Sequence, residues 1–412
     1  MTFNDFNLTD WLKSTLAQMK FTTPTPIQEK SIPLIQTGQD FIGCASTGSG
    51  KTLAFALPLL NQIEVNKKRV VVLCPTRELA QQIEMVIKQV LRQRPSIRSV
   101  LVIGGTSMHR QVSELKQKPQ IIIATPGRLA DHLQQRTVHL QDVGAVVLDE
   151  ADRMLDMGFA PQIERILRQV PENRQTILFS ATFPKATEKL IQRIMRNPQK
   201  VVIGQSSIPL NDITQATLET TVQQKNNMLL DELNARQGSI LIFTRTKSRT
   251  DRLFGYLADY GYSVSRIHGG RSQGQRTTAI KGFRENRYRI MVATDVAARG
   301  IDITDVAHVI NYDLPQVPED YVHRIGRTGR AGAKGHALTM LTPEDRGQWF
   351  EICKAAKLPL PPKPGKPQHP AAKPSQQGQS RHKSRPQQGR HAKSFAKKPH
   401  SRPTPPRFVR PV

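Results

Sequence analysis

Short apolar runs recur along the first half of the chain and alternate with amphipathic stretches. Runs typical of buried parallel strands cover residues 69–75, 121–125, 145–150 and 176–182, and a shorter one covers 40–44. Helical patterns separate them, for example at 77–91 and 160–170. Strands that alternate with helices predict a mainly parallel α/β sheet with helices packed against it.

A polar stretch near residues 204–214 interrupts this rhythm, and a second series of apolar runs then follows. Its members lie at 239–244, 262–268, 289–294, 308–312 and 336–341. The first 31 residues have a helical pattern of their own. We therefore predict a lead-in at 1–31, two α/β domains at 32–206 and 214–358, a linker at 207–213 and a tail at 359–412.

The charge is strongly positive and is concentrated in the tail. The whole chain has a formal net charge of +27, and residues 359–412 contain seven Lys, six Arg, 13 Pro and no acidic residue. With only Phe395 and Phe408 as aromatics, the tail lacks the apolar surface for a core, and we expect it to be disordered. The charge indicates a polyanionic partner.

The sequence argues against a membrane protein and against a metal site built from cysteines. No apolar run reaches 18 residues, and the first ten residues contain two acids, so we expect neither a membrane span nor a signal peptide. Cys44, Cys74 and Cys353 lie far apart and fit small buried hydrophobic residues better than metal ligands.

Three carboxylates follow the apolar run at 146–148, in the sequence Asp149-Glu150-Ala151-Asp152. One interpretation is a solvated acidic turn at the end of a strand. The other is a Mg²⁺ site, because Mg²⁺ is commonly held by one or two carboxylates together with substrate phosphates. The second interpretation requires a phosphate-binding loop elsewhere in the chain.

Such a loop is predicted by "ASTGSGKT" at 45–52, which lies between an apolar run and a helical pattern. Glycine-rich backbone and a helix N-terminus bind phosphate, Lys51 can reach the β- and γ-phosphates, and Thr52 can ligate Mg²⁺. Ala45 departs from the glycine of the general pattern. Asp149 is then the expected metal ligand, and Glu150 can orient or deprotonate water. For Asp152, a salt bridge or helix-start role and direct chemistry both remain open.

Together these segments resemble the DEAD-box RNA helicases, and the resemblance covers about residues 3–345. It is carried by eleven motifs in family order: "FTTPTPIQ" (21–28), "ASTGSGKT", "PTRELA" (75–80), Gly104-Gly105, "TPGR" (125–128), "DEAD", "SAT" (180–182), "LIF" (241–243), "QGQR" (273–276), "ATDVAARGID" (293–302) and "HRIGRTGR" (323–330). The family fold is two tandem RecA-like parallel-sheet domains, here followed by the basic tail.

The resemblance implies that ATP and Mg²⁺ are the cofactors and that Gln28, in the lead-in, reads adenine. The implied nucleotide contacts are Phe3, Thr23, Gln28, Ala45, Ser46, Thr47, Gly48, Ser49, Gly50, Lys51, Thr52 and Asp302. Lys51, Asp149, Glu150, Arg327 and Arg330 would be catalytic, with the two arginines stabilising charge on the γ-phosphate. The residues implied to couple hydrolysis to domain contacts are Asp152, Ser180, Thr182 and His323.

The resemblance also implies an RNA site that crosses both domains. Its candidates are Arg77, Gly105, Thr125 and Arg128 in the first domain and Thr244, Gln273, Arg276 and Thr294 in the second. Contacts to phosphates and sugars would make binding largely independent of sequence. Two positions depart from the family pattern: Lys20 replaces a common Gly, and Gly270 replaces a usual Asp.

We therefore expect an ATP-dependent RNA helicase that locally unwinds short duplexes or remodels ribonucleoprotein. An ATP-gated RNA clamp with little unwinding is the main alternative, and a DNA translocase is a third. The short lead-in and basic tail resemble bacterial members, which suggests a bacterial cytoplasm. A ribosomal precursor and the RNA-decay machinery are both plausible partners.

Overall fold

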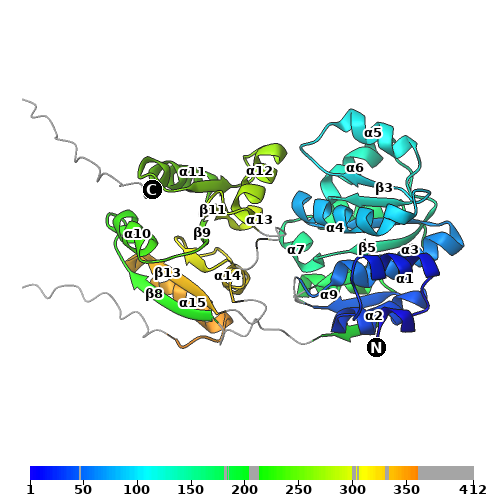
Figure 1. Ribbon diagram of the computed structural model, residues 1–412, viewed down its shortest axis with the longest axis horizontal. Helices are drawn as coiled ribbons and strands as arrows, with labels where there is room; N and C mark the ends of the chain where they lie inside the picture. Colours follow the sequence, from blue (N-terminus) through cyan, green and yellow to red (C-terminus); the bar gives the residue numbers. More distant parts are fainter. Residues whose placement is uncertain are drawn as a thin grey trace, which may run out of the picture. The chain divides into compact units, whose positions relative to one another are not determined.

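The computed structural model describes residues 1–360 apart from 46–47, 181–182, 184, 204–212, 299–302, 304–305 and 330–333. Of the predicted tail, only residues 359–360 are described. The described chain forms two lobes, each built on a parallel sheet with helices against it (Figure 1). No helix in these ranges combines the length and the apolarity that a membrane crossing needs.

The first lobe contains a seven-stranded sheet in the order β3-β4-β2-β5-β6-β1-β7. Its strands are β1 (Phe41–Cys44), β2 (Arg69–Leu73), β3 (Ser99–Val102), β4 (Ile121–Ala124), β5 (Val143–Leu148), β6 (Gln175–Ser180) and β7 (Gln199–Val202). Every pair is parallel. The predicted first series of strands is confirmed, whereas β3 and β7 were missed. Both are edge strands with exposed or half-buried positions, so neither is a continuous apolar run.

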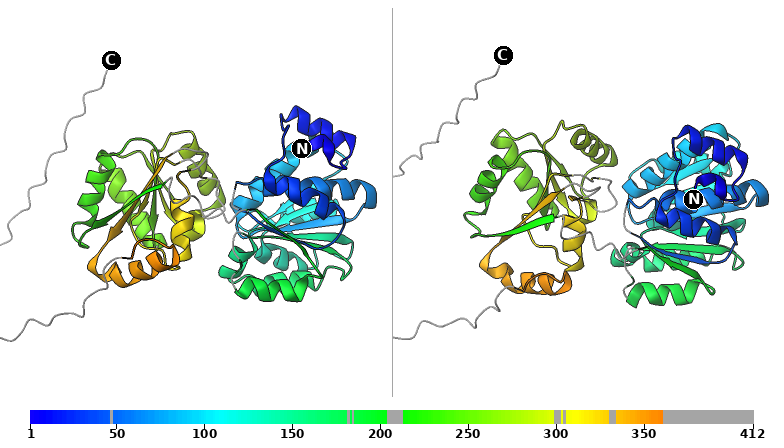
Figure 2. Two further views of the ribbon diagram at one scale, coloured as in Figure 1. Left: turned by 90° about the horizontal axis from the view of Figure 1, so that it is seen from below. Right: turned by 60° about the horizontal axis from the view of Figure 1, so that its bottom comes forward.

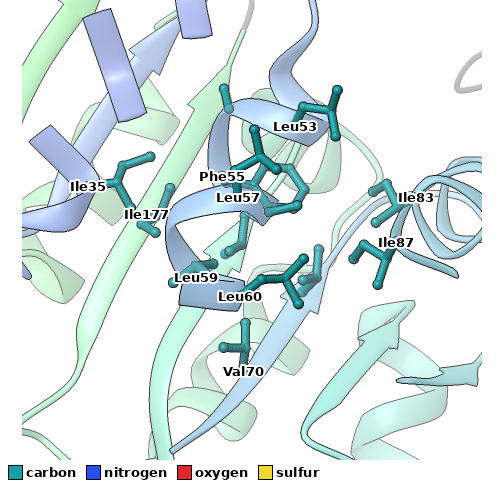
Figure 3. Packing of buried hydrophobic residues seen from close by; sticks show 14 of the residues in the cluster. Ile35, Leu53, Phe55, Leu57, Leu59, Leu60, Val70, Ile83, Ile87 and Ile177 are labelled. Carbon is teal, nitrogen blue, oxygen red and sulfur yellow. The ribbon is translucent and has the colours of Figure 1, made fainter. Parts of the chain in front are cut away.

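Helices cover both faces of this sheet. They are α3 (Lys51–Asn66), α4 (Arg77–Val90), α5 (Met108–Lys116), α6 (Pro126–Gln134), α7 (Ala151–Asp156), α8 (Ala160–Leu167) and α9 (Lys185–Ile194), with a 3-10 turn, η2 (Leu91–Gln93), after α4. Alternate residues of β2 belong to opposite cores: Val70 and Val72 pack with α3 and α4, and Val71 and Leu73 with α6 and α8. Figure 3 shows α3 side chains, including Phe55 and Leu57, in the first of these cores.

The N-terminal segment is part of the first lobe. It contains η1 (Phe3–Asp5), α1 (Asp10–Gln18) and α2 (Pro26–Gln36), which lie on the first lobe (Figure 2). Phe3, Leu12 and Leu16 share the core cluster of α3. A domain boundary after residue 31 would cut α2. Periodicity alone could not show this, because it reveals a helix and not the surface on which that helix packs.

The second lobe contains a six-stranded sheet in the order β10-β11-β9-β12-β13-β8. Its strands are β8 (Ile213–Glu219), β9 (Ile240–Thr244), β10 (Val264–Ile267), β11 (Ile290–Thr294), β12 (His308–Asn311) and β13 (Gly335–Leu341). The helices are α10 (Lys225–Asn234), α11 (Lys247–Asp259), α12 (Gln273–Arg284), α13 (Asp295–Ala298), α14 (Glu319–Ile325) and α15 (Arg346–Ala355), preceded by η4 (Pro343–Asp345). The second predicted series is confirmed, and only the largely exposed edge strand β8 was missed.

Candidate functional site

The phosphate-binding loop connects β1 to α3. Gly48 and Gly50 have φ values of +85° and +95°, a left-handed conformation that glycine adopts without a steric penalty. Lys51 is the first residue of α3, is buried, and donates to the carbonyl oxygen of Ala45 at 3.1 Å. The lysine ammonium is thus held against the loop. Ser46 and Thr47 lie outside the described residues.

The three carboxylates are buried beside this loop. Strand β5 pairs with β6, which pairs with β1, so the carboxyl ends of these strands bring Asp149 near the loop. Asp149, Glu150 and Asp152 are 2%, 6% and 7% exposed, and the interpretation as a solvated acidic turn is therefore wrong. Glu150 has a φ of +53° where α7 begins and forms an ion pair with Arg153 at 2.7 Å. Asp152 Oδ1 accepts a hydrogen bond from its neighbour's amide at 2.9 Å, within the first turn of α7.

The two adjacent acids have opposite pKa shifts. Burial raises the pKa of Asp149 to about 6, although nearby Lys51 opposes the rise. Burial also acts to raise the pKa of Glu150, but Arg153, Lys51 and Arg327 together hold it below its ordinary value. Glu150 is therefore ionised at neutral pH, while Asp149 is a buried carboxylate whose charge a divalent cation would stabilise.

The donor set at this edge fits Mg²⁺. Asp149 is one buried carboxylate with a raised pKa, and Thr52 is the second residue of α3. Such a small set of oxygen ligands matches Mg²⁺, which keeps several waters and binds substrate phosphates. Within the described ranges, no group of three His, Cys, Asp or Glu residues that could hold a metal occurs.

Gln28 connects the lead-in to the phosphate-binding loop. Its Oε1 accepts from the amide of Thr25 at 2.9 Å, and its Nε2 donates to the carbonyl of Gly50 at 3.0 Å. A Cβ on Gly50 would come within 2.5 Å of that Nε2, so the close packing requires glycine. Phe3 is buried in the core and Thr23 is exposed. Adenine reading by Gln28 stays a prediction.

The other half of the same sheet edge is basic. Arg77 follows β2, Gly105 follows β3, and Thr125 follows β4 at the N-cap position of α6. The Arg77 guanidinium lies over Gly104 and Gly105, where a Cβ on Gly105 would overlap it. Arg128, in the first turn of α6, donates to the carbonyl of a residue next to Gly105 at 3.4 Å. The sheet order therefore separates two halves of this edge. The half formed by β5, β6 and β1 carries the phosphate-binding loop and the buried acids and is called the nucleotide half, and the half formed by β3, β4 and β2 carries the arginines and is called the basic half.

The second-lobe candidates for RNA are buried, and their contact with RNA stays a prediction. Thr244 and Thr294 are buried, and the Thr244 hydroxyl is 2.7 Å from that of Thr250. Gln273 and Arg276 are also buried, and both donate to Glu78 of α4, at 3.1 and 2.7 Å. Their side chains are engaged within the protein. Sequence reasoning missed Glu78, because nothing local in "PTRELA" marks its partners.

A second missed residue is Arg324, in α14. It is 2% exposed, donates to both carboxylate oxygens of Asp295 at 2.5 and 2.7 Å, and also bonds Asn311 Oδ1 and the carbonyl of Asp313. These bonds fix α14, which precedes buried Arg327. His323 of the same helix is exposed. Ser180 is fully buried at the end of β6, whereas Thr182, Asp302 and Arg330 lie outside the described residues.

Two family models match the chain. The model of the DEAD/DEAH box helicases matches residues 25–190, and that of the helicase conserved C-terminal domain matches 224–332. Each match falls within one of the two lobes, and together they include the phosphate-binding loop, the buried carboxylates and Arg327.

Curated relatives and solved structures give the same result. The chain is 43% identical over 359 residues to the DEAD-box ATP-dependent RNA helicase CshA of Bacillus cereus, covering 86% of this chain and 68% of that protein. It is 42% identical to the Bacillus subtilis CshA, over 87% and 73% of the two chains. S. cerevisiae Dbp5 bound to RNA and ADP BeF3 is 33% identical, with a TM-score of 0.76 over 86% of this chain and 92% of that one. The chain therefore belongs to the family of DEAD-box ATP-dependent RNA helicases.

Proposed function

We propose that this helicase binds the RNA backbone across both lobes, locally unwinds short duplexes or remodels ribonucleoprotein, and hydrolyses ATP to reset. The observation that carries the proposal is the division of the first sheet edge. Buried Asp149 and Glu150 lie near Lys51 on one half, and Arg77 and Arg128 lie on the other. One rigid element can therefore link the state of the nucleotide to the contacts with RNA.

Thr52 and Asp149 are the residues that would hold Mg²⁺, which supplies charge neutralisation on the phosphates. Lys51 binds the β- and γ-phosphates and Glu150, ionised at neutral pH, orients the attacking water or accepts its proton. Arg327, whose charge already lowers the pKa of Glu150, stabilises charge on the γ-phosphate. Arg330 and Asp302 lie outside the described residues. Arg330 is proposed to contact the γ-phosphate, and Asp302 is proposed to bond the ribose of ATP.

RNA binding is proposed to use phosphates and sugars, with the ribose 2′-hydroxyl favouring RNA over DNA. Arg77, Gly105, Thr125 and Arg128 would form the first-lobe part. Thr244, Gln273, Arg276 and Thr294 would form the second-lobe part. Dbp5 and Mss116p, the latter 28% identical with a TM-score of 0.76, have been solved with RNA, which supports this partner.

A strand-release assay distinguishes a helicase from an ATP-gated RNA clamp. It measures the release of a labelled strand from a short RNA duplex that is in excess over the protein. A helicase releases many strands per protein while ATP lasts. A clamp retains the RNA with ATP and releases few strands. Retention without repeated strand release would reject unwinding and leave the clamp.

The bacterial relatives support a bacterial cytoplasm as the location and a structured bacterial RNA as the substrate. A ribosomal precursor and an RNA bound for decay both fit. For the domain limits, we propose that the first domain includes the lead-in and ends at residue 206, and that the second covers 214–358, as predicted.

A further inference from the structure

A cavity of about 650 Å³ lies on the first lobe at the end of α6 remote from its capping residue Thr125. It is lined by the C-terminal end of α6, by Arg136 and residues 138–141 before β5, by Arg165 of α8 and by Gln169 after that helix. Residues 138–141 precede β5, whereas Asp149 follows it, so the cavity and the nucleotide half occupy opposite edges of a parallel sheet. Neither the proposed hydrolysis nor the proposed RNA contacts use it.

The charge of the cavity lining is entirely positive. Arg136 and Arg165 line it, and no Asp or Glu does. Within the described residues, neither of the two guanidinium groups has an ion pair or side-chain hydrogen bond. Glu164, which precedes Arg165 in the chain, is paired with Arg193 at 2.6 Å, and Asp142, which follows Gln141, is paired with Arg69 at 3.0 Å. The two arginines are thus available to an anion from outside.

The remaining lining combines amides with an apolar floor. His139 lines the cavity together with Gln134, Gln141 and Gln169. The side-chain amides of the three glutamines have no hydrogen-bond partner in the described part of the protein. Val138 and Leu140 are buried beneath them. A pocket of this size suits a small molecule. Guanidinium groups recognise phosphate, and amides can donate to and accept from sugar hydroxyls or base edges.

The loop that carries these groups is held in place. Arg69 of β2 donates to the carbonyl oxygens of His139 and Pro119, at 3.0 and 2.9 Å, as well as to Asp142. His132 of α6 is 2.7 Å from the hydroxyl of Thr137. The backbone of the loop is therefore fixed before a ligand binds, which reduces part of the entropy cost of binding.

We infer that this cavity, here called the α6–α8 pocket, binds a nucleotide phosphate. The nucleotide has two possible sources. A single strand that passes Thr125 and Arg128 has only α6, about 13 Å long, to follow before it reaches the pocket. The same groups would equally bind a free nucleotide. The first source rests on the proposed RNA function and the second does not.

The test compares R136Q/R165Q with the control R92Q/R168Q, in full-length protein. The control removes two exposed arginines of the same lobe that do not line the pocket. Affinity is measured against salt for single-stranded RNAs of about 6 and about 16 nucleotides. In a second arm, binding of labelled 5′-GMP is measured while ADP–beryllium fluoride fills the phosphate-binding loop.

If RNA reaches the pocket, R136Q/R165Q weakens binding of the long RNA alone and flattens its slope of log affinity against log salt by about 1.4, for two phosphates. If a free nucleotide is the ligand, the wild type and the control bind one GMP per chain and R136Q/R165Q binds none. The inference is overturned if R136Q/R165Q matches the control in both arms. RNA-stimulated ATP hydrolysis with the short RNA checks the proposed function separately, since the pocket residues take no part in it.

Discussion

The backbone conformation and the neighbours of Glu150 together determine the position and the charge of its carboxylate. Its left-handed φ of +53° is unusual for a residue other than glycine and suggests that the conformation serves the site. Arg153 holds the carboxylate at 2.7 Å and helps to keep its pKa low. The side chain is therefore charged and fixed in a buried position where a neutral acid would otherwise be favoured.

Replacing Glu150 with Gln should preserve binding of ATP and RNA and lower the rate of hydrolysis by about 10²–10⁴-fold, the usual range for a lost general base. Glutamine retains the shape but cannot accept the proton. Single-turnover hydrolysis with saturating RNA measures the effect. A near-normal rate would show that Glu150 has another role.

The Asp149→Asn variant tests how the free energy of unfolding depends on pH. The folded pKa of Asp149 is about 6 against an ordinary value of 3.8, so the folded state binds the proton more tightly than the unfolded state. Asp149 therefore destabilises the fold above pH 6, by up to ~3 kcal/mol. The variant should be more stable than the wild type at pH 7.5 without Mg²⁺ and nucleotide, and this gain should vanish as the pH falls from 6 towards 4. Urea unfolding across this range measures it, and a gain that does not vary with pH would contradict the assignment.

At the scale of elements, α14 shows what sequence reasoning can and cannot reach. The segment "HRIGRTGR" was recognisable as basic and as resembling a family motif. The separate structural role of Arg324 within this segment was not recognisable, because its hydrogen-bond partners come from α13, β12 and the segment after β12. The same applies to Glu78, whose partners lie about 195 residues away in the sequence. Buried strands were predictable from local apolar runs, whereas contacts between distant segments have no local signal.

Arg324→Met should destabilise the second lobe by about 3–5 kcal/mol, because it leaves the Asp295 carboxylate without its partner. Lysine should restore only part of this loss, since it cannot form both bonds in one plane. The free energy of unfolding in urea measures the change. Arg252→Met, at an exposed position of α11, serves as a control and should change stability by less than about 0.5 kcal/mol. Equal effects of the two substitutions would contradict the role assigned to the Arg324 bonds.

For the whole molecule, the basic tail adds a prediction that is independent of the catalytic residues. Residues 359–412 hold 13 positive charges and no negative one, so they should attract RNA phosphates with little contribution from stacking. Deleting the tail should weaken RNA binding at low salt and flatten the slope of log affinity against log salt by about 2–4. ATP hydrolysis at saturating RNA should persist.

A full-length variant with these 13 Lys and Arg residues replaced by Gln separates charge from length. It should behave like the deletion. If it behaved like the wild type, or if the deletion left the slope unchanged, the tail would have no role in holding RNA.

The stimulation of ATP hydrolysis by RNA, compared with DNA of the same sequence and length, is the most direct measurement of how the two halves of the first sheet edge work together. The buried acids and Lys51 bind and hydrolyse ATP, and the basic half is expected to sense a backbone with 2′-hydroxyl groups. We predict that single-stranded RNA raises the steady-state hydrolysis rate and that DNA does so weakly or not at all. Equal stimulation by RNA and DNA, or hydrolysis that does not respond to RNA, would contradict the coupling.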